Sequence, residues 1–393
     1  MVAPLDDVLV LDLTRALAGP HAAMMLGDLG ARVIKVESPT GDDTRSWGPP
    51  FVEPEQGERE STYFLSANRN KESITLDLKD PADQDVLARL VERADVLMEN
   101  FRVGVLDRLG FPVERLHQLN PRLVVLQITG FGHDGPEAKR SGFDQIAQGE
   151  GGLMSLTGLS EPTKVGVPIA DLLAGMNGAY GVVAALFERE RTGKGRVVHT
   201  SLLAGMVGVH AFQGTKWTVA GEVPGLAGGH HPSIAPYGMF RTADGPVQIA
   251  CGSERLWQDF CREFGVDPAR EGMATNPERV AHRDDVIALV ESLLADLPAA
   301  DVLTRLDAAG VPAGKVRTLD EVYDWEQTRS QGLLIDVEHA TLGTVQAARP
   351  GAPLRRQRLR RRTARARRSP DARPAQRGDP GVARLLSGVP ARA

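Results

Sequence analysis

An aspartate stands where an apolar run of the sequence meets a helix. Asp171 follows the run VGVPIA and opens a glycine-punctuated helix that the spacing predicts over 171–193. At a helix start a carboxylate can accept backbone N–H groups, and the helix dipole favours the anion, so the pKa of Asp171 should be lowered. An ionised carboxylate in this position can act as a nucleophile in covalent catalysis. The alternative for Asp171 is a simple N-cap without a chemical role.

Other kinds of chemistry have little support in the residue types. The 2 cysteines, Cys251 and Cys261, are too few for a disulfide framework or a four-thiolate zinc site. The histidines, including His133, have no metal-ligand spacing. No G-x-G-x-x-G follows the first predicted strand, which disfavours a nicotinamide dehydrogenase. We therefore expect neither a metal nor a permanently bound cofactor.

Short apolar runs alternate with helical stretches through the first third of the chain. A helix should open at Pro20, a favoured first helical position, and 81–94 has helical spacing. This alternation predicts an α/β fold with a Rossmann-like open parallel sheet covered by helices on both faces. The predicted strands are 8–13, 32–37, 73–78, 95–100 and 123–130.

Four segments lie at the carboxyl ends of predicted strands, which is where parallel sheets bind ligands. These segments should therefore share one edge of the sheet and offer loops for a ligand. They read DLTRALAGP, KVESP, ENFRVG and ITGFGHDGP.

The chain should divide into a large and a small domain. The large Rossmann-like domain is predicted over 1–220, with a return over 331–354. A smaller α+β domain is predicted over 221–330, because a hairpin with the turn Asp244-Gly245 is followed by three helical stretches. The Arg-rich segment 355–393 forms no part of either prediction.

Charge is distributed unevenly along the chain. From Arg355 onward, 13 arginines and 2 aspartates give +11, so with a total of −5 the preceding part carries −16. A body this acidic is a poor nucleic-acid binder. The N-terminus has no basic region before its apolar run, and no apolar stretch reaches the length needed to cross a bilayer. We expect a cytoplasmic protein with neither nucleic-acid nor membrane partners.

Five separated motifs occur in an order that resembles the class III CoA-transferases, the CaiB/BaiF group. The resemblance covers about residues 5–350, in the segments DLTRALAGPHAAMMLGDLGARVIKVESP, NRNKESITLDLK, ADVLMENFRVGVLDRLG, ITGFGHDGP and GFDQIAQGEGGLMSLTG…KVGVPIADLLAG. It implies that Asp171 attacks an acyl-CoA to give a mixed anhydride, which CoA converts into an aspartyl thioester before the acceptor acid reacts. Coenzyme A (CoA) is then a substrate, and the resemblance implies an interlocked homodimer.

The resemblance also implies which residues contact CoA. The loop after the first strand should line the thiol end, where Leu17 replaces a glutamine of formyl-CoA transferase and so argues against formyl-CoA as donor. Cations near the nucleotide end should meet phosphates, the alternative for Lys71 and Arg102 being a solvated surface charge. The implied contacts are Arg15, Ala16, Leu17, Ala18, Asn70, Lys71, Arg102, Lys139 and Gly142.

Further catalytic positions follow from the resemblance alone. Asp144 matches an acidic residue close to the nucleophile, although a helix N-terminal role is equally open. The segment GGHHPSIAPYG resembles a glycine loop that closes over the intermediate, with Gly228 and Gly229 supplying the backbone freedom. His230 and His231 could act as acid or base, or could be structural.

Two other functions compete with CoA transfer. An α-methylacyl-CoA racemase would use a histidine of the 130s loop and a G-H-D segment, but this chain has Gly142-Phe143-Asp144, and His133 would have to substitute. A non-catalytic CoA-binding protein should have lost Asp171. Among substrates, succinyl-CoA and small dicarboxylates are suggested by the GFDQIAQ segment.

The segment 355–393 departs from the ending expected for the family. Lys and Glu vanish, Arg, Ala, Pro and Gly dominate, and apolar periodicity is lost. We interpret it as the product of a frameshift in a GC-rich gene. The alternatives are a disordered nucleic-acid arm or a patch for anionic membranes.

Overall fold

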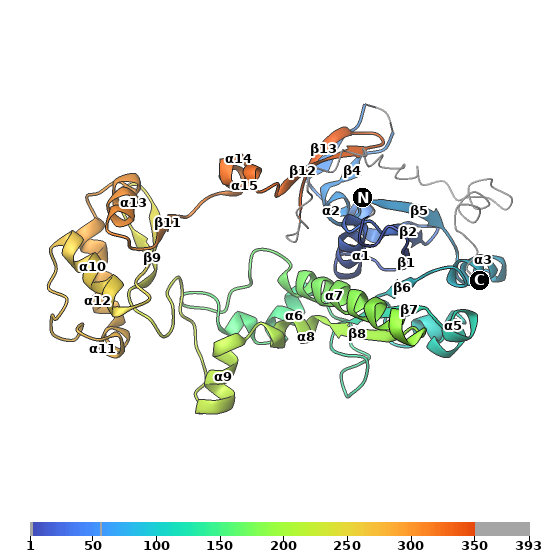
Figure 1. Cartoon of the computed structure of the whole chain (residues 1–393), viewed down its shortest axis with the longest axis horizontal. Helices are drawn as coiled ribbons and strands as arrows, with labels where there is room; N and C mark the ends of the chain where they lie inside the picture. Colours follow the sequence, from blue (N-terminus) through green and yellow to red (C-terminus); the bar gives the residue numbers. More distant parts are fainter. Residues whose placement is uncertain (1–2, 56, 350–393) are drawn as a thin grey trace. The chain divides into compact units, whose positions relative to one another are not determined.

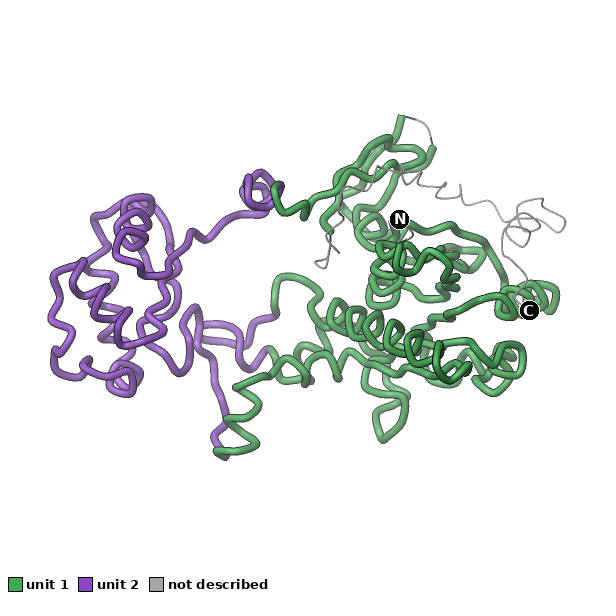
Figure 2. The backbone as a smooth tube through the Cα atoms, in the orientation of Figure 1, with its two compact units in different colours: residues 1–153, 165–220, 330–393 green, residues 154–164, 221–329 purple. Residues whose placement is uncertain are grey.

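The computed structural model describes residues 3–55 and 57–349, and the chain forms two compact units (Figure 2). Unit 1 comprises Met1–Leu153, Val165–Ala220 and Ser330–Ala393, and unit 2 comprises Met154–Lys164 and Gly221–Arg329. Residues 154–164, inside the range predicted for the large domain, thus cluster with the second unit. The predicted Arg-rich tail lies outside the described residues.

A six-stranded parallel sheet forms the centre of unit 1 (Figure 1). The strand order is β5-β2-β1-β6-β7-β8. Strands β2 and β5 are added on one side of β1 and strands β6, β7 and β8 on the other, as in doubly wound folds. The predicted α/β class with a parallel sheet is confirmed. The strands are β1 Leu9–Asp12, β2 Arg32–Glu37, β5 Lys71–Thr75, β6 Val96–Glu99, β7 Val124–Thr129 and β8 Val197–Ser201.

Alternate strand residues face two separate hydrophobic cores, because successive side chains of a strand point to opposite faces. Val10 packs with helices α1 (Ala18–Asp28), α7 (Ile169–Thr192) and α8 (Leu202–Gly208). Its neighbour Leu11 packs on the other face. That face is covered by α3 (Pro81–Val91), α4 (Val105–Arg108) and α5 (Val113–Leu119). The central strands β1, β6 and β7 are buried along their whole length between these two cores.

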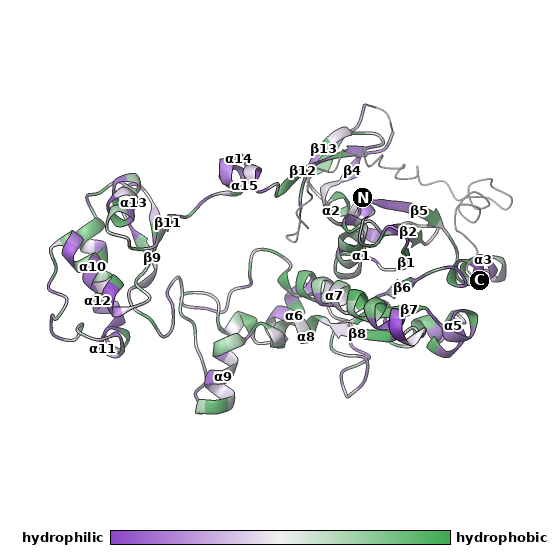
Figure 3. Cartoon of the chain, in the orientation of Figure 1, coloured by the Kyte–Doolittle hydropathy of each residue, from purple (hydrophilic) through white to green (hydrophobic). Residues whose placement is uncertain are grey.

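Helix α7 is apolar along most of its length (Figure 3). By length and composition alone it could cross a membrane, contrary to the expectation that no stretch would reach that length. It packs on α1 and on β7 as a core helix of unit 1. A Cβ built on Gly175 would lie 2.5 Å from the Ala18 carbonyl oxygen, so glycine is needed for this close approach.

Several shorter elements complete unit 1. The pair β12–β13 is antiparallel, and Arg69 Nη1 donates to the Ala348 carbonyl of β13 (3.1 Å). The elements are η1 Asp43–Ser46, β3 Phe51–Val52, β4 Glu60–Ser61, α2 Thr62–Ala67, α6 Asp144–Glu150, α9 Ala211–Ala220, β12 Leu334–His339 and β13 Gly343–Ala348. The short helix η2, Leu153–Ser155, crosses from unit 1 into unit 2.

Unit 2 has its own core under a three-stranded antiparallel sheet, in the order β11-β10-β9. Trp257 and Phe260 are buried in it, and the fully buried Arg279 donates to the carbonyls of Ala235 (2.7 Å) and Met273 (2.9 Å). The elements are β9 Tyr237–Arg241, β10 Pro246–Ala250, α10 Glu254–Phe264, α11 Asn276–Ala281, α12 Arg283–Leu294, α13 Ala299–Ala308, β11 Ala313–Lys315, α14 Leu319–Asp324 and α15 Glu326–Ser330.

Candidate active site

Asp171 lies in the first turn of α7, two residues after the helix begins at Ile169. Its side chain is partly buried, and within the described residues no hydrogen bond reaches its carboxylate. Burial and the nearby charge of Asp144 raise the pKa of Asp171 to about 7. The expectation of a lowered pKa is therefore wrong, because the backbone N–H groups that should have stabilised the anion do not bind it.

Asp144 supplies the cap that was expected of Asp171. Its Oδ1 accepts the N–H of Ala170 in the first turn of α7 (2.8 Å), and its Oδ2 accepts from Gln148 Nε2 (2.7 Å). Asp144 is itself the first residue of α6. It thus has a helix N-terminal role, but on α7, and it brings a second carboxylate close to Asp171.

The loop between β1 and α1 lies one helical turn from Asp171. Positions four apart share a helix face, so Asp171 lies on the face of Gly175, which contacts Ala18. The ring of His21 lies against the same glycine, and burial lowers the pKa of His21 to about 4, which keeps it neutral. The side of α7 that carries Asp171 is therefore turned towards the start of α1.

Tyr63, at the start of α2, is a residue of this site that sequence reasoning missed. Burial, and then the negative charges of Asp171 and Asp144, raise the pKa of Tyr63 to about 12, so its phenol stays protonated as a donor. The indole of Trp47 packs edge-on against it, with ring centroids 5.0 Å apart. A signal was present in the segment SWGPPF…STYF, but no periodicity connects it with Asp171.

The predicted CoA loop, residues 15–18, follows β1 at the point where the strand order reverses. Asn100, after β6, accepts the N–H of Arg15 (2.8 Å) and donates to the Arg15 carbonyl (2.7 Å). The Arg15 guanidinium is exposed and lies 5.9 Å from the centre of the Phe101 ring. Within the part of the chain that the structure describes, the Arg15 guanidinium has no ion pair and could bind an anionic ligand.

The other three residues of the loop are less exposed than Arg15. Ala16 has a left-handed backbone with φ of 63°. Leu17 and Ala18 are buried, at 5% and 3% exposure. Because these three side chains are small or buried, this part of the loop can contact a ligand mainly through its backbone groups.

Lys71 and Asn70, predicted at the nucleotide end of CoA, have their polar groups engaged within unit 1. Lys71 Nζ pairs with Asp12 (2.9 Å) and donates to the Pro20 carbonyl and to Asn68 Oδ1 (both 2.9 Å). The alternative of a solvated surface charge is wrong for Lys71, whose side chain is 3% exposed. Asn70 donates to Asp28 (2.6 Å). A phosphate contact by either residue stays a prediction.

Arg102 and Lys139 are exposed on loops that follow β6 and β7. Gly142 packs against the backbone of Gly130, because a Cβ on Gly142 would lie 2.4 Å from the Gly130 Cα. The two ends of the loop after β7, at Gly130 and Gly142, are therefore packed together just before Asp144. Lys139, within the loop, stays accessible to a ligand.

Gly228 and Gly229 belong to unit 2. Gly228 has a left-handed backbone (φ 56°) and donates to the Gly158 carbonyl (3.0 Å), while the Gly229 carbonyl accepts from Met239 (3.0 Å). The His230 ring packs edge-on against Phe240, and His231 stacks on Tyr237. Both histidines have structural contacts, and closure of the glycine loop over Asp171 stays a prediction.

The remaining titratable groups near this edge of the sheet do not assemble a metal site. Among the described residues, no group of three His, Cys, Asp or Glu side chains could hold a metal ion. His133 lies against His199, with ring centroids 4.3 Å apart. Burial raises the pKa of Glu99 to about 7, and its carboxylate accepts from the Phe101 N–H (2.7 Å) and Gln127 (2.8 Å). The site is thus built from carboxylates, a phenol and backbone groups.

Comparison with known proteins shows the family to which the chain is similar. The sequence profile of CoA-transferase family III matches residues 5–371. Succinate–glutarate CoA-transferase of Agrobacterium fabrum is 40% identical over 87% of each chain. Acetyl-CoA:oxalate CoA-transferase of Acetobacter aceti is 40% identical over 84% of this chain and 85% of its own. The crystal structure of a CaiB/BaiF family protein from Brucella suis superposes with a TM-score of 0.81 at 42% identity, covering 91% of this chain and 93% of its own.

Proposed function

The chain belongs to CoA-transferase family III, and on this premise we propose that it moves CoA from an acyl-CoA donor to a carboxylic acid through Asp171. One observation carries the proposal: a partly buried carboxylate with a pKa raised to about 7 stands beside a second carboxylate, facing the loop after β1. Such an anion is poorly solvated and more basic than an ordinary aspartate, which makes it a stronger nucleophile.

The reaction would proceed in two symmetrical halves. Asp171 attacks the thioester carbonyl, expels CoA as thiolate and forms a mixed anhydride. The thiolate then attacks the aspartyl carbonyl, which releases the donor acid and leaves an aspartyl thioester. The acceptor carboxylate attacks this thioester and expels the thiolate, and the thiolate takes the acceptor acyl group from the new anhydride. Asp171 is regenerated as the carboxylate.

The surroundings of Asp171 favour the covalent intermediates over the free anion. Burial and the charge of Asp144 destabilise ionised Asp171, and both penalties vanish when the carboxylate becomes a neutral anhydride or thioester. The protonated phenol of Tyr63 is a hydrogen-bond donor for the oxyanion that develops at the attacked carbonyl.

Small dicarboxylates are the acids that we propose as substrates. Glutarate, succinate and oxalate stand in the names of two transferases that are 40% identical to this chain. The exposed guanidinium of Arg15, on the loop that faces α7, suits a second carboxylate of the acyl group. The apolar Leu17 supports a donor other than formyl-CoA.

A second copy of the chain is the partner that we propose for α7. Met176, Tyr180, Val183 and Phe187 are 45%, 77%, 39% and 67% exposed and follow one another at helical spacing. An exposed apolar stripe of this kind indicates an interface. It runs along the helix that begins beside Asp171, which fits a dimer that builds its active sites at the interface. Phe187→Glu should convert the dimer to a monomer in light scattering, whereas Val316→Glu in unit 2 should not.

Trapping of the intermediate tests the proposed nucleophile. Wild-type protein incubated with succinyl-CoA and then with borohydride or hydroxylamine should carry a modification at Asp171 in peptide mass spectra. Asp171→Asn should form no adduct, while Asp285→Asn, which changes an exposed first-turn acid of α12, should react like wild type. Tight CoA binding without an adduct from any acyl-CoA would contradict the proposal. Exchange of the α-proton with solvent, again without an adduct, would favour the racemase.

A further inference from the structure

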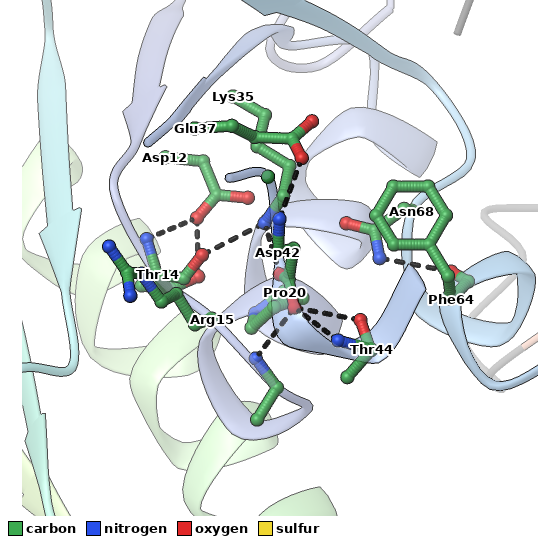
Figure 4. A network of polar contacts seen from close by, with 12 residues as sticks. Asp12, Thr14, Arg15, Pro20, Lys35, Glu37, Asp42, Thr44, Phe64 and Asn68 are labelled. Carbon is green, nitrogen blue, oxygen red and sulfur yellow. Dashed lines mark hydrogen bonds and ion pairs between the residues drawn. The ribbon is translucent and has the colours of Figure 1, made fainter. Parts of the chain in front are cut away.

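A network of buried charges lies directly beneath the loop that follows β1 (Figure 4). Lys35, on β2, pairs with Asp42 at 2.9 Å, with their side chains 2% and 1% exposed. The pair Lys71–Asp12 lies beside it, with side chains 3% and 0% exposed. Four buried charged groups beside one loop are more than packing requires, since apolar residues of similar volume would often stabilise a fold equally well.

Two members of this network bind the backbone of the loop. Lys35 Nζ donates to the Thr14 carbonyl (2.8 Å), and Asp42 Oδ1 accepts a long hydrogen bond from the Ala16 N–H (3.5 Å). Asp42 is fixed in turn, because its N–H donates to Glu37 (3.0 Å) and its Oδ1 accepts from the N–H of Thr44 (3.0 Å). The pair therefore connects the loop after β1 with the loop after β2.

The residue between these contacts has a backbone that needs support. Ala16 has φ of 63°, in the left-handed region that a side chain with a Cβ disfavours. A residue stays in this region when the surrounding structure holds it there. Ala16 stands two residues before Ala18, which touches the face of α7 that carries Asp171.

We propose that Lys35 and Asp42 are positioning residues for the transfer reaction, because they hold Ala16 in its left-handed conformation and thereby set the loop opposite Asp171. With side chains only 2% and 1% exposed, both residues would act through the loop and not by contact with substrate. This inference rests on the proposed function for its catalytic meaning, while the placement of the loop can be tested without any activity.

The test compares two neutral double variants. Lys35→Met/Asp42→Asn removes both charges of the pair and leaves neither unpaired. The matched control is Asp95→Asn/Arg189→Met, which removes another buried ion pair (3.0 Å, with Arg189 4% and Asp95 2% exposed). Asp95 directly precedes β6, so this pair lies at the amino end of the strand, away from the loop after β1. Turnover is expressed per site trapped as covalent adduct, so that unfolded molecules do not count.

The Lys35–Asp42 variant should lose about 10- to 100-fold in kcat per trapped site, the loss expected when reacting groups are displaced by about 1 Å. The control should lower the melting temperature and leave kcat per site within about 2-fold of wild type. Ala16→Gly, added to the Lys35–Asp42 variant, should restore part of kcat, because glycine adopts a positive φ without a steric penalty. An unchanged kcat, an equal loss in the control, or no recovery with Ala16→Gly would each overturn the proposal.

Hydrogen exchange separates a failure of this inference from a failure of the proposed function. The amides of residues 14–18 should exchange faster in the Lys35–Asp42 variant than in wild type, and at the wild-type rate in the control. If wild type forms no adduct, the proposed function fails, and the exchange rates still decide whether the pair holds the loop. Unchanged protection in the Lys35–Asp42 variant overturns the inference even if wild type is active.

Discussion

Asp171 combines partial burial, a neighbouring carboxylate and a carboxyl group without hydrogen bonds among the described residues. Its pKa is raised to about 7 in the folded chain, so ionised Asp171 is less stable in the folded state than in the unfolded state. Between about pH 4 and 7 the folded chain keeps a proton that the unfolded chain has released, so stability falls as the pH rises through this window. The same environment that raises nucleophilicity should therefore destabilise the fold at neutral pH.

Asp171→Asn should consequently be more stable than wild type at pH 8, by on the order of 1–3 kcal/mol. The gain arises because asparagine has no charge to bury, and it should shrink as the pH falls towards 4. Urea unfolding at several pH values measures it. Asp285→Asn should show no such gain, and a variant of Asp171 that is less stable at pH 8 would contradict the pKa assignment.

Asp144→Asn should move the pH dependence of adduct formation. Removal of the second charge lowers the pKa of Asp171, so the rising limb, near pH 7 in wild type, should shift to lower pH. The rate at pH 6 relative to pH 8 should then increase about 2- to 5-fold in stopped-flow acylation. Glu150→Gln changes an exposed acid on the same helix and should leave the limb in place, while an unmoved limb in Asp144→Asn would exclude the coupling.

At the residue scale, the sequence pointed to Asp171 through the motifs around it, but it gave the wrong electrostatics. The cap of α7 comes from Asp144, 27 residues before Asp171 in the numbering, and only the folded chain brings the two together. Tyr63 was missed for the same reason. The ion pair of Lys71 was not predicted either, because its partner Asp12 is 59 residues away and sits on another strand.

At the scale of elements, the contact between α1 and α7 sets where Asp171 lies. Gly175→Ala should destabilise the protein by about 1–3 kcal/mol, because the new methyl group meets the backbone oxygen of Ala18. Adduct formation should slow as well, since the two helices must separate. The matched control is Gly208→Ala in α8, where nothing lies within 4 Å of the built Cβ. It should be neutral or stabilising, by up to about 1 kcal/mol, in thermal unfolding.

Strands with a run of apolar residues were readable from the sequence. The five predicted strands correspond to β1, β2, β5, β6 and β7. Apolar runs mark four of them, whereas β5 is mostly half-buried and begins two residues before the predicted 73–78. The sixth, β8, reads VVHTS, and most of it is partly exposed at the edge of the sheet. The hairpin β12–β13 was missed because its residues are half exposed and its pattern is weak.

At the scale of the whole molecule, each unit has its own core, so damage to one should leave the other folded. Arg279→Met should destabilise unit 2 by about 2–4 kcal/mol, because two buried carbonyls lose their donor. Hydrogen exchange should then accelerate in α10 and α12 but not in α1 or α7. Arg255→Met removes an 83% exposed arginine of α10 and should change stability by less than about 0.5 kcal/mol. Equal acceleration in both units would show that they unfold together.

The architecture of unit 1 could be predicted because its order of strands and helices is regular along the chain. The assignment of 154–164 to unit 2 could not, since this segment has no periodicity of its own and is held there by contacts such as Gly158 with Gly228. The exposed apolar side of α7, from which we propose a dimer, could not be predicted, because the sequence pattern of α7 does not tell an exposed apolar side from a buried one.

The chain of unit 1 is interrupted by unit 2, and this has a consequence for synthesis. All six strands of the parallel sheet have been made once Ser201 has been translated, so the sheet can assemble while unit 2 is still on the ribosome. Among the described elements, β13 is made last, and its Ala348 carbonyl binds Arg69 across 279 positions of sequence. We expect a nascent chain stopped near residue 330 to have formed α7, with Asp171, before the hairpin β12–β13 joins unit 1.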